Sequence, residues 1–387
     1  MKLTLISSSF YPSYKFGGPI FSTYYMAKGL AQLGVEVQVV TTDANLDTKL
    51  NENLTKLTKL ESNLYVKYYK SITKHGMSIS HILALPKYIK ECDVVYLQGV
   101  FNIHSPITLF LSKVYKKKII FSTRGALGGW CLDQGSKFKK PWLHYLIKPF
   151  LKNIVWHTTS EDEKQEVLSV FSNSKIEVIP NGIYLDEYNK FNELSKQQYI
   201  EKYTNKKNFN NIDKIVVSLG RLQRKKGFDI LIKAFAKSTY IKNSILLMAG
   251  PDEGEKDNLH TLINSLNLQE KVFLIGSING QDKVDFLVNA DLFVLPSHHE
   301  NFGNVYVEAL ASGIPIVASK NTPWKAVEEY DCGLWINNSI EETTKAMDFM
   351  LNKNSNKMKI NSKKLASKFD WNNLAIDFYH VLEDIKK

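Results

Sequence analysis

The sequence predicts an α/β protein with two doubly wound domains, each built on a mostly parallel sheet. Short apolar strands alternate with helical patterns from one end of the chain to the other, which is typical of parallel sheets covered by helices. With 387 residues, the chain is also too long for one ordinary hydrophobic core. Because such sheets bind ligands at the carboxyl ends of their strands, we expect the two domains to face a central cleft.

The first half of the chain opens with a complete βαβ unit. A strand is followed by the glycine pair Gly17 and Gly18, a helix over 19–33, and a second strand. A proline at the helix start and Gly34 just past its end are typical helix boundaries. Residues 45–75 are polar and are expected to form a surface excursion. The expected strands of this half lie at 2–9, 35–42, 93–99, 118–125, 155–160 and 175–181.

A polar stretch rich in Asn and Lys marks the expected domain boundary. Linkers are polar and make few buried contacts, so we assign 1–188 to the first domain, 189–210 to a linker and 211–369 to the second domain. Residues 370–387 have apolar positions at helical spacing and are expected to form a closing helix. The expected strands of the second domain lie at 214–220, 244–250, 272–277, 291–297, 314–319 and 333–337.

Positive charge is concentrated in the first half. Residues 1–185 hold 23 Lys and Arg against 13 Asp and Glu, a balance of +10, whereas residues 186–387 hold 27 against 26, a balance of +1. This asymmetry suggests an anionic partner, such as membrane phosphates, a phosphorylated acceptor or nucleic acid. An ordinary solvated surface rich in lysine explains it equally well.

Two segments, 113–118 and 137–152, carry much of this charge. In the second of them, lysines alternate with aromatic and aliphatic residues, a pattern typical of segments that lie on an anionic membrane surface. A helix that packs its apolar face on the sheet with lysines reaching outward would show the same pattern. No apolar run approaches the ~20 residues needed to cross a bilayer. The apolar N-terminal run is too short for a signal peptide, and three scattered cysteines fit a reducing compartment. We therefore expect a cytoplasmic protein, with peripheral membrane binding as one option.

Two cations follow the first strand of the second domain. Arg221 leaves the strand and Lys226 lies at the start of the next helix, with Gly220 and Gly227 on either side. A helix start favours negative charge, so both cations are suited to binding a diphosphate. They would neutralise it as a leaving group. The alternative is a solvated run of charges at the surface.

Two glutamates occupy a similar setting later in the same domain. Glu300 lies in a turn after a strand, and Glu308 lies in the helix that follows. Eight helical positions at ~100° each would leave the two side chains about 80° apart, so separate roles are expected. Glu300 can reach a reacting group, and Glu308 can accept hydrogen bonds from a vicinal diol such as a ribose. Helix-start amides suited to phosphate or sugar oxygens belong to Phe302, Gly303 and Asn304.

The sequence around the two glutamates resembles the donor-binding signature of retaining GT-B glycosyltransferases of family four. In that signature two glutamates are separated by seven residues, as Glu300 and Glu308 are here. The resemblance extends over nearly the whole chain. Gly17 and Gly18 resemble the glycine loop of the family, GRLQRKKG is similar to its Gly-Arg-Leu…Lys-Gly segment, and IPNGI matches the usual end of the first domain. The helix at 370–387 resembles the one that crosses back onto that domain.

The resemblance implies a GT-B fold and the transfer of a sugar from a nucleotide-diphosphate sugar to a hydroxyl, with retention at the anomeric carbon. It implies that the diphosphate is bound by Arg221 and Lys226, beside the glycine loop. It implies neither a metal nor another cofactor, because the family uses cations and helix starts, and no Asp-x-Asp motif is present. The acceptor would be a glycan or a polyprenyl-linked precursor in bacterial surface polysaccharide synthesis, such as O-antigen, capsule or exopolysaccharide.

The chain departs from the family pattern at three positions. Asn301 stands where many members have glycine, and Gln98 stands where many have a histidine. Arg124 lies where a Pro-His-Gly segment is common, and it could supply fixed positive charge near the reacting groups. Gln98 could position a substrate but could not carry a proton. His104 is close in sequence and could replace the missing histidine, although a lone histidine is more often structural.

Two other functions share some of these features. A nucleotide-sugar epimerase on the same fold would convert the donor without an acceptor. A nucleic-acid-binding protein would also have a basic half. The aromatic residues follow the core patterns of strands and helices rather than a stacking platform, so we expect no nucleic acid partner.

Overall fold

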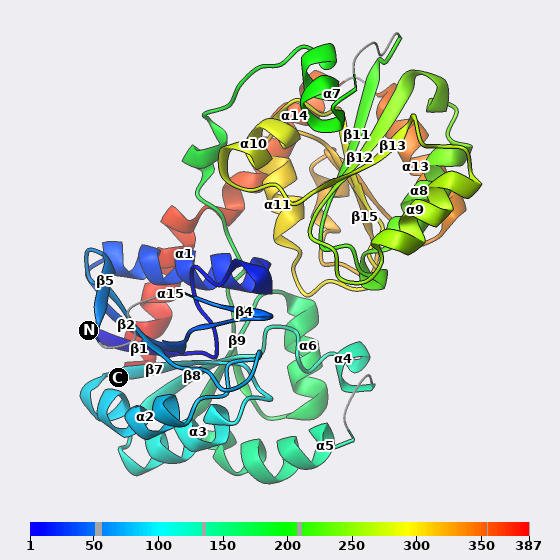
Figure 1. The fold of residues 1–387 in the computed structure, drawn as a ribbon. Coiled ribbons are helices and arrows are strands. Elements are labelled where there is room, and N and C mark those ends of the chain that lie inside the picture. The colour runs from blue at the N-terminus through cyan, green and yellow to red at the C-terminus, as the bar shows by residue number, and fades with distance from the viewer. Residues whose placement is uncertain (51–55, 134–136, 207–210, 354, 387) are drawn as a thin grey trace. The chain divides into compact units, whose positions relative to one another are not determined.

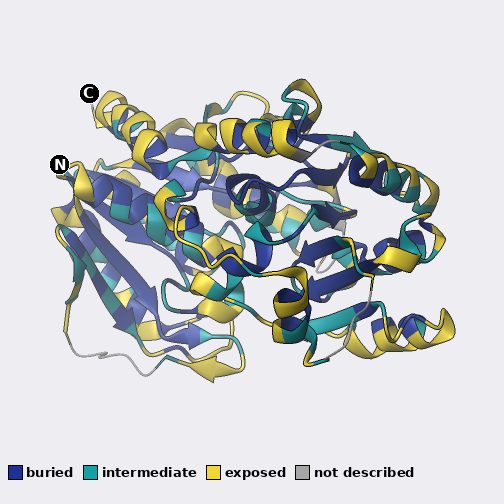
Figure 2. Cartoon of the chain, turned by 90° about the horizontal axis from the view of Figure 1, so that it is seen from above, coloured by how far each residue is buried: buried dark blue, intermediate teal, exposed yellow. Residues whose placement is uncertain are grey.

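The computed structural model describes residues 1–50, 56–133, 137–206, 211–353 and 355–386. The chain forms two compact units, Met1–Ile183 with Trp371–Lys387, and Tyr184–Asp370. Each unit is an open sheet with helices on both faces (Figure 1). The strands are buried, and the helices are exposed on their outer sides (Figure 2). The fold class predicted from the sequence, two doubly wound α/β domains, is confirmed.

The first unit contains a sheet of eight strands in the order β10-β9-β8-β7-β1-β2-β6-β5. All neighbouring pairs are parallel except β5 with β6. The chain turns from one side of β1 to the other, so β1 and β7 flank the point where such sheets bind ligands. The strands are β1 (Lys2–Ile6), β2 (Glu36–Thr42), β5 (Thr58–Glu61), β6 (Leu64–Tyr69), β7 (Val94–Gln98), β8 (Lys118–Ser122), β9 (Ile154–Thr158) and β10 (Lys175–Val178); a small hairpin joins β3 (Ala44–Asn45) to β4 (Thr48–Lys49).

The expectation of a surface excursion at 45–75 is wrong for its second part. β6 lies beside β2 in the sheet, and its alternate residues Leu64, Val66 and Tyr68 are fully buried. The intervening polar residues of this strand obscured its alternating pattern. Residues 51–55 of the excursion lie outside the described residues.

The C-terminal helix α15 (Trp371–Lys386) belongs to the first unit. It packs against α1 (Gly18–Gln32), and its apolar face is buried. The ring of Phe378 lies 5.1 Å from that of His157 and 5.8 Å from that of Tyr96. The other helices of this unit are α2 (Ile79–Glu91), α3 (His104–Val114), α4 (Gly129–Asp133), α5 (Lys139–Trp142) and α6 (Glu161–Val170).

The second unit contains a parallel sheet of six strands in the order β13-β12-β11-β14-β15-β16. Its first strand, β11, is central, and the chain switches direction between β11 and β14. The strands are β11 (Lys214–Leu219), β12 (Ser244–Ala249), β13 (Val272–Gly276), β14 (Leu292–Leu295), β15 (Ile316–Ser319) and β16 (Gly333–Ile336). The helices are α7 (Lys196–Thr204), α8 (Phe228–Lys237), α9 (Lys256–Ser265), α10 (Gly280–Val288), α11 (Asn304–Ala311), α12 (Ala326–Glu329), α13 (Ile340–Asn352) and α14 (Ser355–Ala366).

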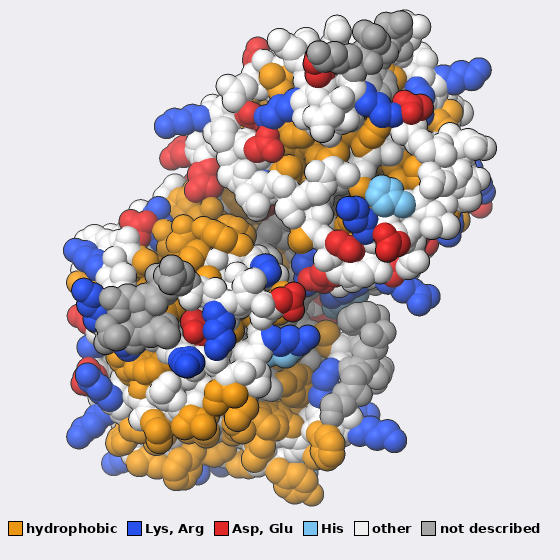
Figure 3. Space-filling view, in the orientation of Figure 1, with side chains coloured by type: hydrophobic (Ala, Val, Ile, Leu, Met, Phe, Trp, Pro, Cys, Tyr) orange, Lys and Arg blue, Asp and Glu red, His pale blue; other side chains and the backbone are white. Residues whose placement is uncertain are grey.

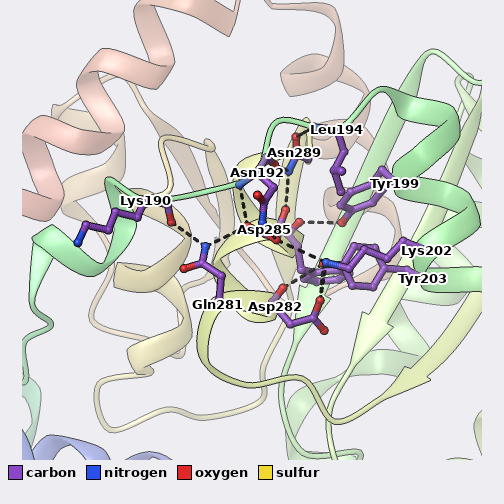
Figure 4. Close-up of polar contacts among 11 residues, drawn as sticks. Lys190, Asn192, Leu194, Tyr199, Lys202, Tyr203, Gln281, Asp282, Asp285 and Asn289 are labelled. Carbon is purple, nitrogen blue, oxygen red and sulfur yellow. Dashed lines mark hydrogen bonds and ion pairs between the residues drawn. The ribbon is translucent and has the colours of Figure 1, made fainter.

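Residues 189–206, expected to be a linker, are instead part of the second unit. Tyr199 on α7 is fully buried and donates a hydrogen bond of 2.7 Å to a backbone carbonyl of α10. Asp285 on α10 accepts hydrogen bonds from both the backbone and the side chain of Asn192, at 2.9 and 2.8 Å (Figure 4). The Asn- and Lys-rich composition concealed these few anchoring residues. Residues 207–210 of the expected linker lie outside the described residues.

Replacing Asp285 by alanine is expected to destabilise the second unit by roughly 1–3 kcal/mol, because the hydrogen bonds that the buried, charged carboxylate accepts from Asn192 and Gln281 are lost. Burial disfavours the charged carboxylate, but hydrogen bonds from Asn192 and Gln281 outweigh it and hold the pKa of Asp285 below its usual range. The control is Asp282→Ala, which removes a half-exposed partner of Lys202 and should cost about 1 kcal/mol or less. Urea unfolding followed by circular dichroism measures both variants. Equal midpoints for the two would contradict a role for Asp285 as an anchor.

Among the residues that the structure describes, none of the helices combines the length and the apolar composition that crossing a membrane requires.

Candidate active site

Three loops of the second unit meet beyond the carboxyl ends of β11, β14 and β15. The backbone amide of His298, after β14, donates to the carbonyl of Lys225, after β11, at 2.8 Å. The amide of Glu300 donates to the carbonyl of Asn321, after β15, at 3.1 Å. These two bonds fix the loop after β14 between its neighbours, so side chains from all three loops are held close together.

Two glycines allow these loops to take their shape. Gly227 has φ +67°, and a Cβ there would lie 2.1 Å from the carbonyl oxygen of Pro296. Gly303 has φ +78°, and a Cβ there would lie 2.7 Å from the ring of Tyr306. A side chain at either position would clash and would also strain the backbone. The first glycine lets the loops approach each other, and the second directs the chain into α11.

Lys226 and Glu300 form a direct ion pair at the centre of these loops. The lysine Nζ lies 2.5 Å from the glutamate Oε1, and each side chain is only 11% exposed. The Ser297 hydroxyl donates to the same oxygen at 2.9 Å. Burial disfavours the charged carboxylate, but Lys226 and Ser297 outweigh it and hold the pKa of Glu300 below its usual range. Glu300 is therefore an anion at neutral pH, balanced by one buried ammonium group.

Gly220 leaves the space through which the side chain of Lys226 passes. A Cβ at Gly220 would lie 3.3 Å from both Cδ and Cε of the lysine, which is tighter than ordinary contact. Gly220 thus has a specific role in placing the ammonium group of Lys226.

Arg221 has a different partner and does not join the Lys226–Glu300 pair directly. Its Nη1 lies 2.7 Å from Oε1 of Glu253, which follows β12. The arginine side chain is 40% exposed. Sequence reasoning missed Glu253, since nothing in the local pattern distinguishes it from a surface glutamate.

Glu308 pairs with a second lysine rather than with Lys226. Its Oε1 accepts a hydrogen bond of 2.8 Å from Nζ of Lys283 on α10. The side chains are 13% and 22% exposed, respectively. The two glutamates therefore have separate cationic partners. Sequence reasoning did not identify Lys283.

The start of α11 is anchored by the side chain of Phe302, the residue before Gly303. Phe302 is buried, with ring centres of Trp324 and Phe369 at 5.3 and 5.6 Å. Its carbonyl accepts a hydrogen bond of 2.6 Å from the Trp324 indole. Asn304 is the first residue of the helix. Phe302 thus acts as a hydrophobic anchor that sets the position of the helix start.

The predicted site residues of the first unit lie at the carboxyl side of its own sheet. Gly17 has φ +76° and directly precedes α1, which begins at Gly18. Arg124 follows β8 and donates to the hydroxyls of Ser22 and Thr23 on α1, at 3.1 and 2.9 Å. It also donates to Oδ1 of Asn181 at 2.9 Å, and its Nε is buried without a hydrogen-bond partner. Among the described residues, these guanidinium partners are all neutral, so no direct carboxylate contact offsets its charge.

His104 lies in the environment of a structural histidine. It is buried, its Nε2 lies 3.2 Å from the carbonyl oxygen of Gln98, and its ring packs against His81 at 5.4 Å. Burial lowers the pKa of His104 to about 4, so the ring is neutral at physiological pH. The side chain of Gln98 accepts a hydrogen bond of 3.1 Å from Thr23. Gln98 is thereby linked to the helix that Arg124 also contacts.

Glu163 on α6 holds the loop that carries Arg124, and sequence reasoning missed it. The carboxylate is fully buried and accepts hydrogen bonds of 2.6 Å from the amides of both Gly125 and Thr159. Ser160 caps the same helix by accepting from the Glu163 amide at 3.2 Å. The spacing Ser-x-x-Glu is a helix-start signature that could have revealed the cap, but not the carboxylate's role in fixing the loop.

Family models match both halves of the chain. One described as "Glycosyltransferase Family 4" matches residues 16–187. Another, described as "Glycosyl transferases group 1", matches residues 200–365. Between them the two matches include every residue predicted for the site.

Relatives and solved structures agree with these two family matches. An uncharacterized glycosyltransferase of Methanocaldococcus jannaschii is 26% identical over 87% of this chain and 85% of its own length. The α-monoglucosyldiacylglycerol synthase of Streptococcus pneumoniae is 23% identical over 60% of this chain and 52% of its own. The crystal structure of HepE from Anabaena, in complex with UDP and glucose, superposes with a TM-score of 0.75 at 18% identity over 99% of this chain and all of that one. The chain therefore belongs to the family-four glycosyltransferases and has the GT-B fold.

Proposed function

We propose that the protein is a retaining glycosyltransferase that moves a sugar from a nucleotide-diphosphate sugar to a hydroxyl of a glycan or polyprenyl-linked acceptor. The observation that carries the proposal is the buried Lys226–Glu300 pair at the switch point between β11 and β14. The complex of the Anabaena protein with UDP and glucose supports a nucleotide-sugar donor.

In the proposed site, cations of the second unit bind the donor diphosphate. Lys226 contacts Glu300 and Arg221 contacts Glu253 in the structure. When the donor binds, a phosphate oxygen can replace a carboxylate oxygen beside either cation, so that the positive charge stays balanced by a negative one. The start of α11 adds partial positive charge. We propose that these groups neutralise the leaving diphosphate without a metal ion.

The two glutamates have separate proposed roles. Glu300 accepts hydrogen bonds from hydroxyls of the transferred sugar, since its carboxylate is ionised and lies beside the proposed phosphate ligand Lys226. Glu308 accepts hydrogen bonds from the ribose diol of the nucleotide. Lys283, which contacts Glu308, would hold that carboxylate in position.

Residues of the first unit complete the proposal. We assign Gly17 and Gly18 to close approach of the backbone to the donor, because neither carries a side chain and α1 starts there. We assign Arg124 to stabilising negative charge during the reaction. Its guanidinium is held by neutral oxygens, so its charge remains available to an anion.

We propose a role in bacterial surface polysaccharide synthesis at the cytoplasmic face of the membrane. The lipid named in the streptococcal synthase supports a membrane-held acceptor. The basic segments 113–118 and 137–152 support a peripheral location, because such segments bind anionic lipid surfaces.

Thermal-shift measurements with a panel of nucleotide sugars test the donor assignment. The correct donor and its nucleotide should raise the melting temperature, by an amount that corresponds to about 2.7 kcal/mol at a hundredfold excess over Kd. Product analysis with and without acceptor then distinguishes transfer from epimerisation of the donor.

Glu308→Ala is expected to weaken binding of that nucleotide roughly 10- to 100-fold, since hydrogen bonds to a charged group contribute about 1.5–3 kcal/mol. Isothermal titration measures the change. The matched control is Glu341→Ala, which removes a glutamate from an exposed pair with Lys345 on α13. Equal affinity of the Glu308 variant and the control would remove Glu308 from the donor site.

A further inference from the structure

One part of the first unit is almost free of acidic residues. Residues 62–160 contain 15 Lys and Arg but only three acidic residues, Glu91, Asp93 and Asp133. In residues 186–387 the two signs are nearly equal, at 27 and 26. A lysine-rich composition throughout the chain therefore does not explain the difference. The positive charge belongs to one segment of the fold.

The same segment exposes large apolar side chains. Figure 3 shows hydrophobic side chains gathered over α2, α3 and α5 at the bottom of the view. Several are more than half exposed, which is unusual for aliphatic and aromatic residues in such number. The exposed large apolar residues of this segment are Ile72, Met77, Ile79, Leu83, Ile103, Phe110, Val114, Phe138, Tyr145 and Leu146.

These side chains are additional to the apolar faces that pack on the sheet. On α2, the exposed Ile79 and Leu83 lie one turn apart, while Leu85 and Ile89 are buried. Lys87 continues the exposed stripe at the next turn. The helix thus carries a core face and, separately, an outer face that is apolar at one end and basic at the other.

The other two elements have the same arrangement. On α3, Phe110 and Val114 are 56% and 54% exposed and lie one turn apart, whereas Leu109 is buried. In the segment 137–152, Phe138 and Tyr145 are 78% and 71% exposed. Packing on the sheet is done there by Leu143 and Ile147, both of which are buried. Packing against the sheet therefore accounts for only part of the apolar pattern in this segment.

The three elements form one continuous face. α2 packs against α3, and α3 packs against residues 143–153. The indole of Trp142 donates a hydrogen bond of 2.9 Å to the carbonyl of Val100, just before α3. The ammonium group of Lys113 lies 5.8 Å from the ring centre of Phe150. We call the exposed side chains of α2, α3 and residues 137–152 the basic apolar face.

We propose that the basic apolar face docks the protein onto an anionic lipid bilayer, with its apolar side chains inserted among the acyl chains and its lysines on lipid phosphates. This combination of exposed aliphatic, aromatic and lysine side chains is that of interfacial membrane anchors. A nucleic acid backbone would use the lysines but not the aliphatic side chains. The sequence pattern indicated only 113–118 and 137–152, and the structure adds α2.

The proposal rests on the proposed function only in giving the acceptor a membrane location, because docking itself requires neither donor nor acceptor. Flotation with phosphatidylcholine vesicles, with and without phosphatidylglycerol, measures docking directly. The full chain should float with the anionic vesicles and remain unbound with the neutral ones. Absence of binding to the anionic vesicles would overturn the proposal and leave the transferase assignment intact.

Two sets of substitutions test the face itself. Leu83→Ser with Phe138→Ser and Tyr145→Ser should weaken vesicle binding ~10-fold or more, since binding scales with inserted apolar area. The matched control is Phe349→Ser with Ile360→Ser, at exposed positions of the second unit. Donor hydrolysis without an acceptor should be unchanged in both. Equal vesicle binding by the two sets of variants would overturn the proposal. So would binding of the protein to duplex DNA instead of vesicles, or a wild-type dimer that the Leu83, Phe138 and Tyr145 substitutions dissociate.

Discussion

Lys226→Ala is expected to lower the turnover of sugar transfer ~10²-fold or more, the usual scale for a preorganised electrostatic group. The lysine side chain is 11% exposed, and the position of its ammonium group is defined by the Glu300 carboxylate and by the space that Gly220 leaves. A charge held in this way needs little reorganisation when the diphosphate leaves. Alanine would remove the charge from the phosphates and would also leave the carboxylate without its cation.

The control for this variant is Arg224→Ala, which lies two residues earlier and is exposed. A solvated charge run would make the two substitutions equivalent, whereas a phosphate site predicts a large effect only at Lys226. Steady-state rates with the identified donor, taken with and without a chelator, measure the difference. The melting temperature of each variant separates a loss of chemistry from a loss of folding. Unchanged turnover in the Lys226 variant would refute the phosphate assignment.

The loops of the site could be predicted from the sequence because their signals are local. Parallel strands read as short apolar runs, and the residues that follow them must lie at the same edge of the sheet. Gly227 and Gly303 mark the turns, since each has a positive φ and no room for a Cβ. These features placed Lys226 and Glu300 after two strands of the same domain, whereas the contact between their loops, across 74 positions, follows from the β11-β14 neighbourhood that the structure shows.

The partners of the charged residues could not be predicted in this way. Lys283 and Glu253 contact predicted site residues from helices and loops 25 and 32 positions away. Whether two such side chains meet depends on strand order and on the crossing of helices, which short-range patterns do not encode. The same limit explains Glu163, whose carboxylate binds the amides of two separate loops.

The wrong expectation for residues 189–206 has a different cause. Composition indicates how many residues can be buried, but a few aromatic side chains are enough to attach a polar segment to a domain. Tyr199 and Tyr203 pack on α10, with ring centres 6.0 and 5.1 Å from that of Phe286. Their hydroxyls are satisfied by backbone carbonyls of the same helix. Polar composition alone therefore did not reveal where the second unit begins.

Glu300→Ala is expected to reduce turnover ~10²-fold or more while affecting folding much less, because the carboxylate is held ready for a substrate rather than for core packing. Its two hydrogen-bond donors in the structure are the Lys226 ammonium and the Ser297 hydroxyl. Because Ser297 is fully buried and the Lys226 side chain is only 11% exposed, the substitution also leaves a buried lysine without its anion. The melting temperature measures this cost separately from the loss of turnover.

Glu300→Gln separates charge from shape. Glutamine keeps the length of the side chain and can still accept from Ser297, but it cannot balance Lys226. If the negative charge matters, glutamine should be nearly as slow as alanine; if only a hydrogen-bond acceptor is needed, it should retain much of the rate. Ser297→Ala provides the matched control, since it removes one donor to the carboxylate and leaves the ion pair in place. Rates and melting temperatures measured together decide between these outcomes. Normal turnover in Glu300→Ala would remove the residue from the site. A large fall in melting temperature for both Glu300 variants would instead show that the residue stabilises the fold.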